Sequence, residues 1–474
     1  MTRQKTRNQG QHPKEPASRR ERSARPFDAV KAPEPGGTGA DARSCAVACL
    51  VRVLERGQSL DDALSAVFGA ARFAALSARD RAFARLIVAT VLRRHGELTA
   101  ILTRFLSKPL PAKFGHVRQN LLSASAQLLC LGTPAHAAIS LAVEVTRAER
   151  PSAHLDRLTN AVLRRVAAEG PALLAGLDAV GLDIPDWMLA RWERAYGPET
   201  ARMIGEASLR PAALDISVKA DAAHWAKELG GRLLPTGSVR VPAEGPIEAL
   251  PGFREGAWWV QDAAAALPHR LLGDVRGQEV ADLCAAPGGK TMALAAAGAR
   301  VTAVDQSGAR LERLKDNLRR TRLEADCIEA DVATWSPGRL FDAVLLDAPC
   351  TATGTIRRHP DILHLKRAGD LEAIVPVQAR LLESAAALVR PGGRLVYCTC
   401  SLEPEEGEWQ IEAFLERHTE LESRPAVAAE LGVEPRSITP KGQLRTLPFH
   451  LAPEGSSPGG IDGFFAARLE RISR

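Results

Sequence analysis

The sequence has no two cysteines in the C-x-x-C spacing, although it contains eight cysteines in 474 residues. Paired cysteines of that kind are typical of structural zinc sites and redox motifs. A chain of this length buries a full hydrophobic core without disulfides, so we expect reduced thiols and a cytoplasmic protein. The cysteines stand at positions 45, 49, 130, 284, 327, 350, 398 and 400.

Long apolar segments are missing as well. No apolar run reaches the ~18 residues that a membrane-spanning helix requires. The N-terminus is rich in Arg, Gln and Pro and lacks the apolar centre of a secretory signal. We therefore expect no membrane partner. The net charge of +6 and the pI of about 9.0 permit a polyanionic partner instead.

The first part of the chain divides into a tail and a helical domain. Residues 1–42 lack hydrophobic periodicity, which predicts a disordered basic tail; an arm that helps to hold RNA is the alternative. Residues 43–175 have a helical period and short Gly/Pro breaks, which predict an all-α bundle. Within it, Ser59 is placed to cap a helix, and Gly96 is placed to end one.

The rest of the chain predicts a second, mixed part. Residues 176–255 form a connector or small α/β subdomain, with strands expected in ALDISVKA and WWVQDA. From residue 256 to 474 strands and helices alternate, which predicts βαβ units and a mainly parallel, Rossmann-like sheet. No repeat of the solenoid type is visible. The predicted fold class is therefore a multidomain chain, all-α first and α/β second.

A glycine-containing loop follows the first strand of the expected sheet, in DLCAAPGGKT, residues 282–291. Gly288 and Gly289 let the backbone approach a ligand, and the next helix offers free N–H groups. The rival is a phosphate-binding P-loop. However, Cys284 replaces its first glycine, and Pro287 removes an amide that would hold phosphate. The sequence thus disfavours a nucleoside triphosphate.

Carboxylates follow the next two strands. Asp305 ends RVTAVD, where an acidic side chain suits the ribose hydroxyls of an adenosine cofactor. Capping of the following helix is the alternative for Asp305. Asp331 is placed to meet an adenine amino group.

Reactive groups follow two further strands. Asp347 and Cys350 stand in LLDAPC, and Cys398 and Cys400 stand in CTCS. Because the carboxyl ends of parallel strands meet at one edge of a sheet, we expect these groups in one crevice. A metal site, a disulfide and a nucleophile all use such thiols. We expect no metal, because the spacing of ligands is unsuitable.

These motifs together resemble the RNA 5-methylcytosine methyltransferases that use S-adenosylmethionine. The segments that carry the resemblance are DLCAAPGGKT, DAPCTATG, RRHPDI, VRPGGRLVYCTCSLEPEE and DGFFAARLER. The stretches LSARDRAFARLIVATVLRRHGEL and LTNAVLRRV resemble the NusB-like domain of one branch, the bacterial 16S ribosomal RNA cytosine-C5 methyltransferases of the Sun/Fmu (RsmB) type. The resemblance spans nearly everything after the tail.

The resemblance implies a covalent mechanism. Cys400 would attack C6 of the cytosine, Cys350 would assist product release, and Asp347 would hydrogen-bond the N3/N4 edge of the base. The family's DAPCSGTG is DAPCTATG here. Thr351 and Ala352 thus replace Ser and Gly, which makes this loop stiffer and bulkier.

The resemblance also implies ligands. Arg357 and Arg358 would contact RNA phosphates, with a solvated charged loop as the alternative. The expected partner is 16S rRNA, bound by a monomer that binds no DNA. S-adenosylmethionine would be held by Cys284, Ala285, Ala286, Pro287, Gly288, Gly289, Lys290, Asp305, Asp331 and Asp347.

Two other functions stay open at this point. The same chemistry on transfer RNA is one, because the catalytic half alone does not distinguish the substrates. The other is a non-catalytic RNA-binding or antitermination factor that keeps a methyltransferase shell.

Overall fold

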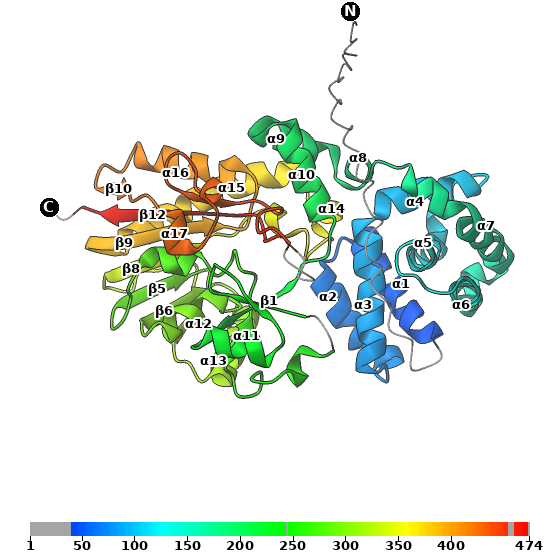
Figure 1. The fold of residues 1–474 in the computed structure, drawn as a ribbon, viewed down its shortest axis with the longest axis horizontal. Helices are drawn as coiled ribbons and strands as arrows, with labels where there is room; N and C mark the ends of the chain where they lie inside the picture. Colours follow the sequence, from blue (N-terminus) through cyan, green and yellow to red (C-terminus); the bar gives the residue numbers. More distant parts are fainter. Residues whose placement is uncertain (1–38, 243–244, 454–458, 473–474) are drawn as a thin grey trace, which may run out of the picture.

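The computed structural model describes residues 39–242, 245–453 and 459–472. A helical domain and a domain built on a large, mostly parallel sheet lie side by side (Figure 1). The predicted fold class is confirmed. Most of the expected tail, 1–38, lies outside the described residues, and residues 40–42 already belong to the first helix. No helix among the described residues is long and apolar enough to cross a membrane.

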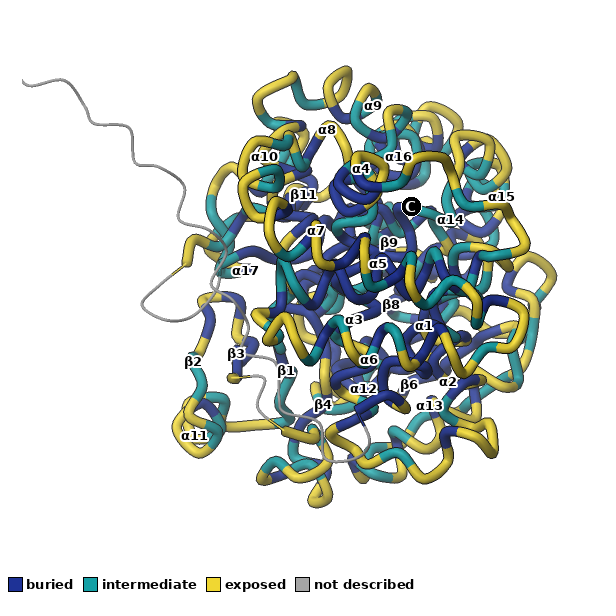
Figure 2. The backbone as a smooth tube through the Cα atoms, turned by 90° about the vertical axis from the view of Figure 1, so that its right-hand side faces the viewer, coloured by how far each residue is buried: buried dark blue, intermediate teal, exposed yellow. Residues whose placement is uncertain are grey.

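The amino-terminal helices pack around one hydrophobic core, and their inner faces are buried (Figure 2). As predicted, Ser59 caps a helix, because its side chain accepts the N–H of Asp62 (3.2 Å). Cys45 and Cys49 are buried in this core. The helices are α1 (Ala40–Arg56), α2 (Leu60–Phe68), α3 (Ala78–Arg93), α4 (His95–Phe105), α5 (Gly115–Leu129), α6 (Ala135–Ala148) and α7 (Asp156–Ala175).

The connector contains four further α-helices and a small antiparallel sheet in the order β2-β3-β1-β4. Strand β4 pairs with β1, so this sheet extends beyond residue 255, where the sequence had suggested the boundary. The elements are α8 (Ala179–Asp183), α9 (Asp186–Tyr196), α10 (Pro198–Ser208), β1 (Leu214–Val218), α11 (Ala222–Glu228), β2 (Arg232–Leu233), β3 (Val239–Val241) and β4 (Trp258–Val260).

The large sheet has the order β10-β12-β9-β8-β5-β6-β7, and β11 pairs with β12. Strands β5 to β9 are parallel, whereas β12 runs antiparallel to β9. The strands are β5 (Glu279–Leu283), β6 (Arg300–Asp305), β7 (Asp326–Glu329), β8 (Phe341–Asp347), β9 (Val389–Thr399), β10 (Leu421–Ser423), β11 (Leu444–Thr446) and β12 (Phe464–Arg471).

Helices cover both faces of this sheet. Successive side chains of a strand point to opposite faces, so a strand that is apolar throughout needs a packed layer on each side. In β8, Val344 and Leu346 pack in the same core as α15, whereas Ala343 and Leu345 face the core that contains Leu294 of α12. The helices are α12 (Gly289–Ala296), α13 (Gly308–Thr321), α14 (Ile362–Leu365), α15 (Ala368–Ala387), α16 (Glu408–Leu415) and α17 (Ala428–Leu431).

The direction of the chain across the sheet reverses between β5 and β8. From β5, the strands β6 and β7 are added on one side, and β8 and β9 on the other. Ligands of open α/β sheets bind outside the carboxyl ends of the strands at such a switch point. The fold therefore places a ligand site beside the loops that follow β5 and β8.

The helical domain is fixed to the catalytic sheet by the segment that contains RRHPDI. The Asp361 carboxylate accepts the free N–H of Leu60 at the start of α2 (2.9 Å). Arg93 donates to the carbonyl of Arg357 (2.8 Å). Because these bonds join residues far apart in sequence, the two domains form one packed unit.

Gly96 joins the helical domain to α8 of the connector. The prediction that it ends a helix was wrong. Helix α3 ends at Arg93, and α4 begins at His95. The Gly96 N–H donates to the Asp183 carboxylate of α8 (2.7 Å). A Cβ atom at Gly96 would lie 1.9 Å from the carbonyl oxygen of Leu182. The close approach of α8 therefore requires glycine here.

We expect Gly96→Ala to lower the free energy of unfolding by about 2 kcal/mol, because α4 and α8 must separate to admit the methyl group. Gly369→Ala is the matched control, since a Cβ there meets nothing within 4 Å. That change should raise stability by about 0.5–1 kcal/mol. Denaturant unfolding of both variants tests this, and equal effects would contradict the joint.

Candidate active site

Two thiols meet at the carboxyl edge of the large sheet. Strands β8 and β9 are parallel neighbours in which Asp347 pairs with Cys398. Cys350 follows the end of β8, and Cys400 follows the last residue of β9. Their sulfur atoms lie 3.4 Å apart. The structure thus brings the two predicted catalytic cysteines together.

The two thiols differ in their environments. The hydrogen bond to Cys400, together with burial, raises the pKa of Cys350 well above its usual range. Either sulfur can be the donor at this distance, and a protonated Cys350 leaves Cys400 as the acceptor. A nucleophile must be a thiolate. The arrangement favours Cys400 for that role.

Cys398, the last but one residue of β9, lies inside the protein. Its side chain is 0% exposed, and its thiol donates to Asp347 Oδ1 (3.5 Å). Burial, and then the charge of Asp347, raise the pKa of Cys398 well above its usual range. A buried neutral thiol of this kind packs and does not react.

Asp347 forms an ion pair with a lysine from the glycine-containing loop. Lys290 Nζ donates to Asp347 Oδ2 (2.7 Å). Burial alone would lower the pKa of Lys290, but the charge and hydrogen bond of Asp347, together with further negative charge nearby, raise that pKa by more, so the lysine stays charged. The Asp347 side chain keeps 34% exposure, so a ligand can reach it.

A cavity of about 380 Å³ opens beside this ion pair. Of the residues predicted to bind ligands, some line it: Ala285, Ala286, Pro287, Gly289, Lys290, Asp347 and Arg358. Cys284, Gly288, Asp305 and Asp331 are not among its lining residues. The lining also includes residues of β4, of the loop before it and of α13: Phe253, Trp259, Val260, Asn317 and Arg320.

The loop after β5 fits the expected cofactor at one buried atom. Asp282 accepts the hydroxyl of Thr291 with Oδ2 (2.6 Å), while Oδ1 is buried and finds no protein partner. Burial raises the pKa of Asp282 to about 7, and the nearby charges of Asp347 and Asp305 add to the effect. An unsatisfied buried carboxylate oxygen suits a ligand ammonium group, which S-adenosylmethionine carries. Sequence reasoning missed Asp282, although it stands at the end of a buried strand.

Asp305 and Asp331 occupy different environments. Asp305 is buried, and its oxygens accept the N–H groups of Ala286 (3.1 Å) and Ser307 (3.0 Å). It therefore holds the turn before α13, whose N-cap is Ser307. Asp331 is exposed and accepts the N–H of Ala333 (2.9 Å). Their contacts with a cofactor stay predictions.

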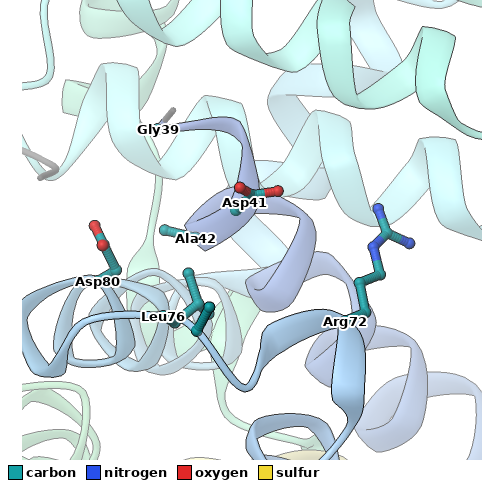
Figure 3. Close-up of a pocket in the computed structure, with 7 residues that line it drawn as sticks. Gly39, Asp41, Ala42, Arg72, Leu76 and Asp80 are labelled. Carbon is teal, nitrogen blue, oxygen red and sulfur yellow. The ribbon is translucent and has the colours of Figure 1, made fainter. Parts of the chain in front are cut away.

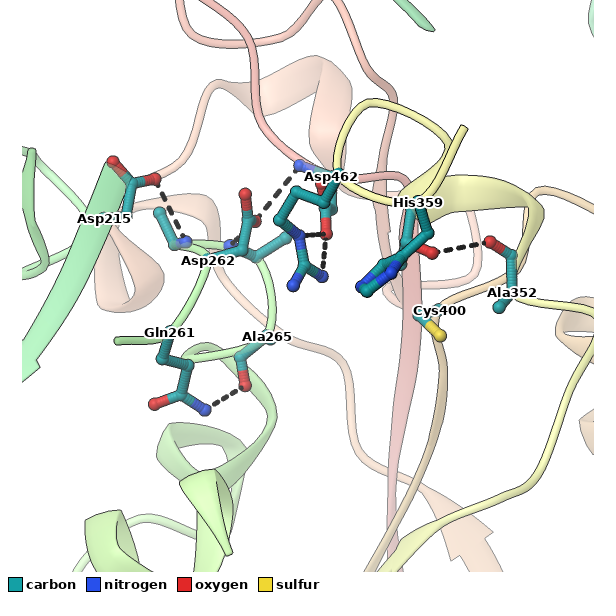
Figure 4. A network of polar contacts seen from close by, with 12 residues as sticks. Asp215, Gln261, Asp262, Ala265, Ala352, His359, Cys400 and Asp462 are labelled. Atoms are coloured by element: carbon teal, nitrogen blue, oxygen red, sulfur yellow. Dashed lines mark hydrogen bonds and ion pairs between the residues drawn. The ribbon is translucent and has the colours of Figure 1, made fainter. Parts of the chain in front are cut away.

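The two arginines of RRHPDI lie in different environments. Arg357 is 2% exposed and donates to the carbonyl of Gly459 (3.2 Å), so the prediction that it contacts phosphate was wrong. A buried guanidinium cannot reach the RNA backbone. Arg358 lines the cavity and pairs with Asp462, which in turn donates its N–H to Asp262 (3.1 Å; Figure 4). Its contact with the substrate stays a prediction.

Glu406 is a second residue that sequence reasoning missed. It is 0% exposed, and Oε1 accepts the N–H of Thr351 (2.8 Å) and the amide of Gln378 (2.9 Å). Its Oε2 accepts the hydroxyls of Thr351 and Ser401. Thr351 follows Cys350, and Ser401 follows Cys400, so one carboxylate holds both cysteine loops. An acidic run directly after CTCS was the available signal.

A smaller hollow of about 110 Å³ lies in the helical domain, between the start of α1 and α3 (Figure 3). Its lining includes Asp41, Arg72 and Asp80 and contains no thiol. Neither the cysteines at positions 350 and 400 nor the ion pair of Lys290 and Asp347 lines this hollow.

We expect Glu406→Gln to lower the free energy of unfolding by about 1–2 kcal/mol, because charge-assisted hydrogen bonds become neutral ones. Alkylation of Cys350 by iodoacetamide should become several-fold faster relative to Cys400, since its loop is no longer held. Glu412→Gln, which only removes the surface pair with Lys441, is the control. An unchanged labelling ratio would mean that Glu406 stabilises the fold without positioning the thiols.

Comparisons with known proteins agree with both halves of this architecture. The family model described as 16S rRNA methyltransferase RsmB/F matches residues 270–470, and the NusB family model matches residues 40–168. The crystal structure of PH0851 has the same fold, with a TM-score of 0.70 and 23% identity, over 91% of this chain and 99% of that one.

Relatives of known name match the chain over nearly its whole length. Ribosomal RNA small subunit methyltransferase B of Xanthomonas campestris pv. campestris is 36% identical over 94% of this chain and 100% of its own. The protein of the same name from Cronobacter sakazakii is 34% identical over 90% of this chain and 98% of its own. The protein is an RNA methyltransferase with a NusB-family domain, and the chain belongs to the RsmB/F family of 16S rRNA methyltransferases.

Proposed function

We propose that this enzyme methylates C5 of a cytosine in 16S rRNA through a covalent bond between Cys400 Sγ and C6 of the base. The observation that carries the proposal is the pair of thiols 3.4 Å apart, beside the ion pair of Lys290 and Asp347. S-adenosylmethionine is the methyl donor, and it supplies an electrophilic methyl group when bound.

Covalent addition of the thiolate is needed to activate C5 of the cytosine. C5 of cytosine is a weak nucleophile, so it does not attack a methyl group directly. Addition of the Cys400 thiolate to C6 places electron density on C5, which then takes the methyl group. Loss of the C5 proton and cleavage of the S–C6 bond restore the aromatic ring and the free thiolate.

Cys350 assists the last of these events. Its thiol stays protonated and lies next to Cys400 Sγ, so it donates to the sulfur as negative charge returns there. A hydrogen bond to a developing thiolate lowers the barrier for its departure. Without this donor the protein–RNA adduct should persist.

Asp347 orients the base and stabilises its protonated or charge-shifted form. Its carboxylate would hydrogen-bond the N3/N4 edge, which favours the charge-shifted ring during addition of the thiolate. Lys290 holds Asp347 Oδ2, so the carboxylate keeps one orientation. Because Asp347 lines a cavity between elements and keeps only 34% exposure, the cytosine must leave its stack to reach it, which favours an unpaired target.

The cofactor would be held at the loop after β5. Gly288 has φ of 102°, and a Cβ there would lie 2.8 Å from Leu314, so only glycine lets the loop reach the first turn of α12. That turn directs free N–H groups outward. Asp282 would meet the ammonium of the donor through its unpartnered oxygen.

We expect binding of S-adenosylhomocysteine to strengthen from pH 6 to pH 8. Its ammonium pairs with the ionised form of Asp282, whose pKa is raised to about 7, so binding below pH 7 must displace a proton. Titration calorimetry should show affinity rising up to about tenfold per pH unit below the pKa. Asp282→Asn should lower the affinity at pH 8 and abolish this dependence. A slope that survives in the variant would assign the proton to another group.

Two cysteine variants test the function. Cys400→Ser should abolish methyl transfer to 16S rRNA, and Cys350→Ser should accumulate a covalent RNA adduct, visible on a denaturing gel. The wild-type enzyme should protect one cytosine of 16S rRNA in bisulfite sequencing. Glu412→Gln, which removes only a surface ion pair with Lys441, is the control.

The other outcomes are equally definite. Protection of a cytosine in transfer RNA alone would replace the ribosomal substrate. Methyl transfer by Cys400→Ser would remove the covalent mechanism. An absence of adduct with Cys350→Ser would remove the role of Cys350 in release.

A further inference from the structure

Three cations lie together where the small sheet meets the end of α13. Lys219 follows β1, and Arg320 and Arg322 lie at the carboxyl end of α13 and just beyond it. We call these three residues the basic rim. Lys219 Nζ donates to the carbonyl of Thr321 (2.7 Å), which joins the small sheet to the helix.

The basic rim carries uncompensated charge. Arg320 donates to the carbonyls of Phe253 (2.9 Å) and Trp258 (3.0 Å), and no carboxylate of the described residues lies within ion-pair distance of the three cations. Burial, and then the charges of Arg322 and Arg320, lower the pKa of Lys219. This crowding of like charge costs free energy unless an anion binds there.

Several surface cations elsewhere in the same domain are arranged differently. They pair with neighbouring carboxylates, as in Arg300 with Glu279, Arg319 with Asp316, Arg390 with Asp342, Arg417 with Glu383, and Lys441 with Glu412. The basic rim differs from these pairs because it gathers three cations at one place, where Lys219 lies near the charges of Arg322 and Arg320.

One residue of the rim, Arg320, lines the cavity that the ion pair of Lys290 and Asp347 also lines. Arg320 lines that cavity together with Phe253 and Asn317, and Arg358 is a further lining residue. A nucleotide whose base enters the cavity must leave its phosphates outside, near the opening. The rim lies where those phosphates would pass.

The rim is also rigid. A Cβ atom at Gly256 would lie 1.9 Å from the carbonyl oxygen of Arg320, so the small sheet packs tightly on the end of α13. The Arg320 guanidinium lies 4.3 Å from the centre of the Phe253 ring. Because the cations are held in place before binding, little entropy is lost when a ligand is bound.

We propose that the basic rim binds the phosphodiester backbone of the nucleotides that flank the target cytosine and so directs the RNA strand into the cavity. This inference rests on the proposed function, because it assumes a flipped cytosine beside Asp347. The rim contributes position and affinity, whereas the groups inside the cavity recognise the base.

The double variant Lys219→Gln, Arg322→Asn tests the proposal. Both residues are replaced by neutral ones, and asparagine suits position 322, where φ is 53°. Binding of a 16S rRNA fragment containing the methylated cytosine should weaken about tenfold at physiological salt. The slope of log K against log salt should fall by about 2, since two phosphate contacts are lost.

The matched control is the double variant Arg276→Gln, Arg390→Gln. Both arginines are exposed and lie before β5 and at the start of β9, on the opposite edge of the sheet. This control removes the same charge and should keep wild-type affinity and salt slope. The charge-conserving variant Lys219→Arg, Arg322→Lys should also bind RNA as the wild type does.

The outcomes separate this inference from the proposed function. S-adenosylhomocysteine affinity, measured on each preparation, reports that the fold is intact. Unchanged RNA affinity in Lys219→Gln, Arg322→Asn, or an equal loss in the control, would refute RNA binding by the basic rim. The wild type would still methylate the fragment in that case. Failure of the wild type to methylate any ribosomal cytosine would instead refute the proposed function.

Discussion

The parallel pairing of β8 with β9 is the constraint on which the site depends. It places Asp347 opposite Cys398, and the two cysteine loops then leave the sheet side by side. A slip of one residue would reverse the face of every side chain in a strand. Both strands are buried, so the alternating apolar residues of β8 hold the register against such a slip. Chemistry between residues distant in sequence thus depends on packing in the sheet.

Buried carboxylates then connect the rest of the molecule to these loops. Glu406 joins the two cysteine loops to each other, Glu403 joins the end of one loop to Arg191 and Trp192 of α9, and Asp361 caps α2. Ionised groups are costly to bury unless donors surround them. Each carboxylate therefore holds its segments firmly. The helical domain and the catalytic loops are consequently parts of one structure.

The cysteine loop also carries local strain. Ala352 has φ of 61°, in the left-handed region that glycine adopts freely, and the resembling family has glycine there. Such a residue persists only where its surroundings hold it. Thr351, bonded to Glu406 on one side, and the bond from the Gly354 N–H to the Cys400 carbonyl (3.0 Å) provide that support. Strain beside Cys350 is thus balanced by contacts with the neighbouring loop.

The sequence by itself determined the class of fold, the order of the domains and the residue types of the site. Helical periodicity, alternating strands and helices, and groups at strand ends such as Asp347, Cys350 and Cys400 are local patterns, and local patterns are visible in a sequence. Only the tertiary structure decided which polar groups are buried and what they meet. Nothing local distinguishes Arg357, which is inside the protein, from Arg358, which lines the cavity. Gly96 reads as a helix end but is required by the approach of α8, and Glu406 reads as surface charge but lies beneath both thiols. The physical reason is that burial and pairing depend on contacts between segments distant along the chain, whereas periodicity and capping depend on neighbours.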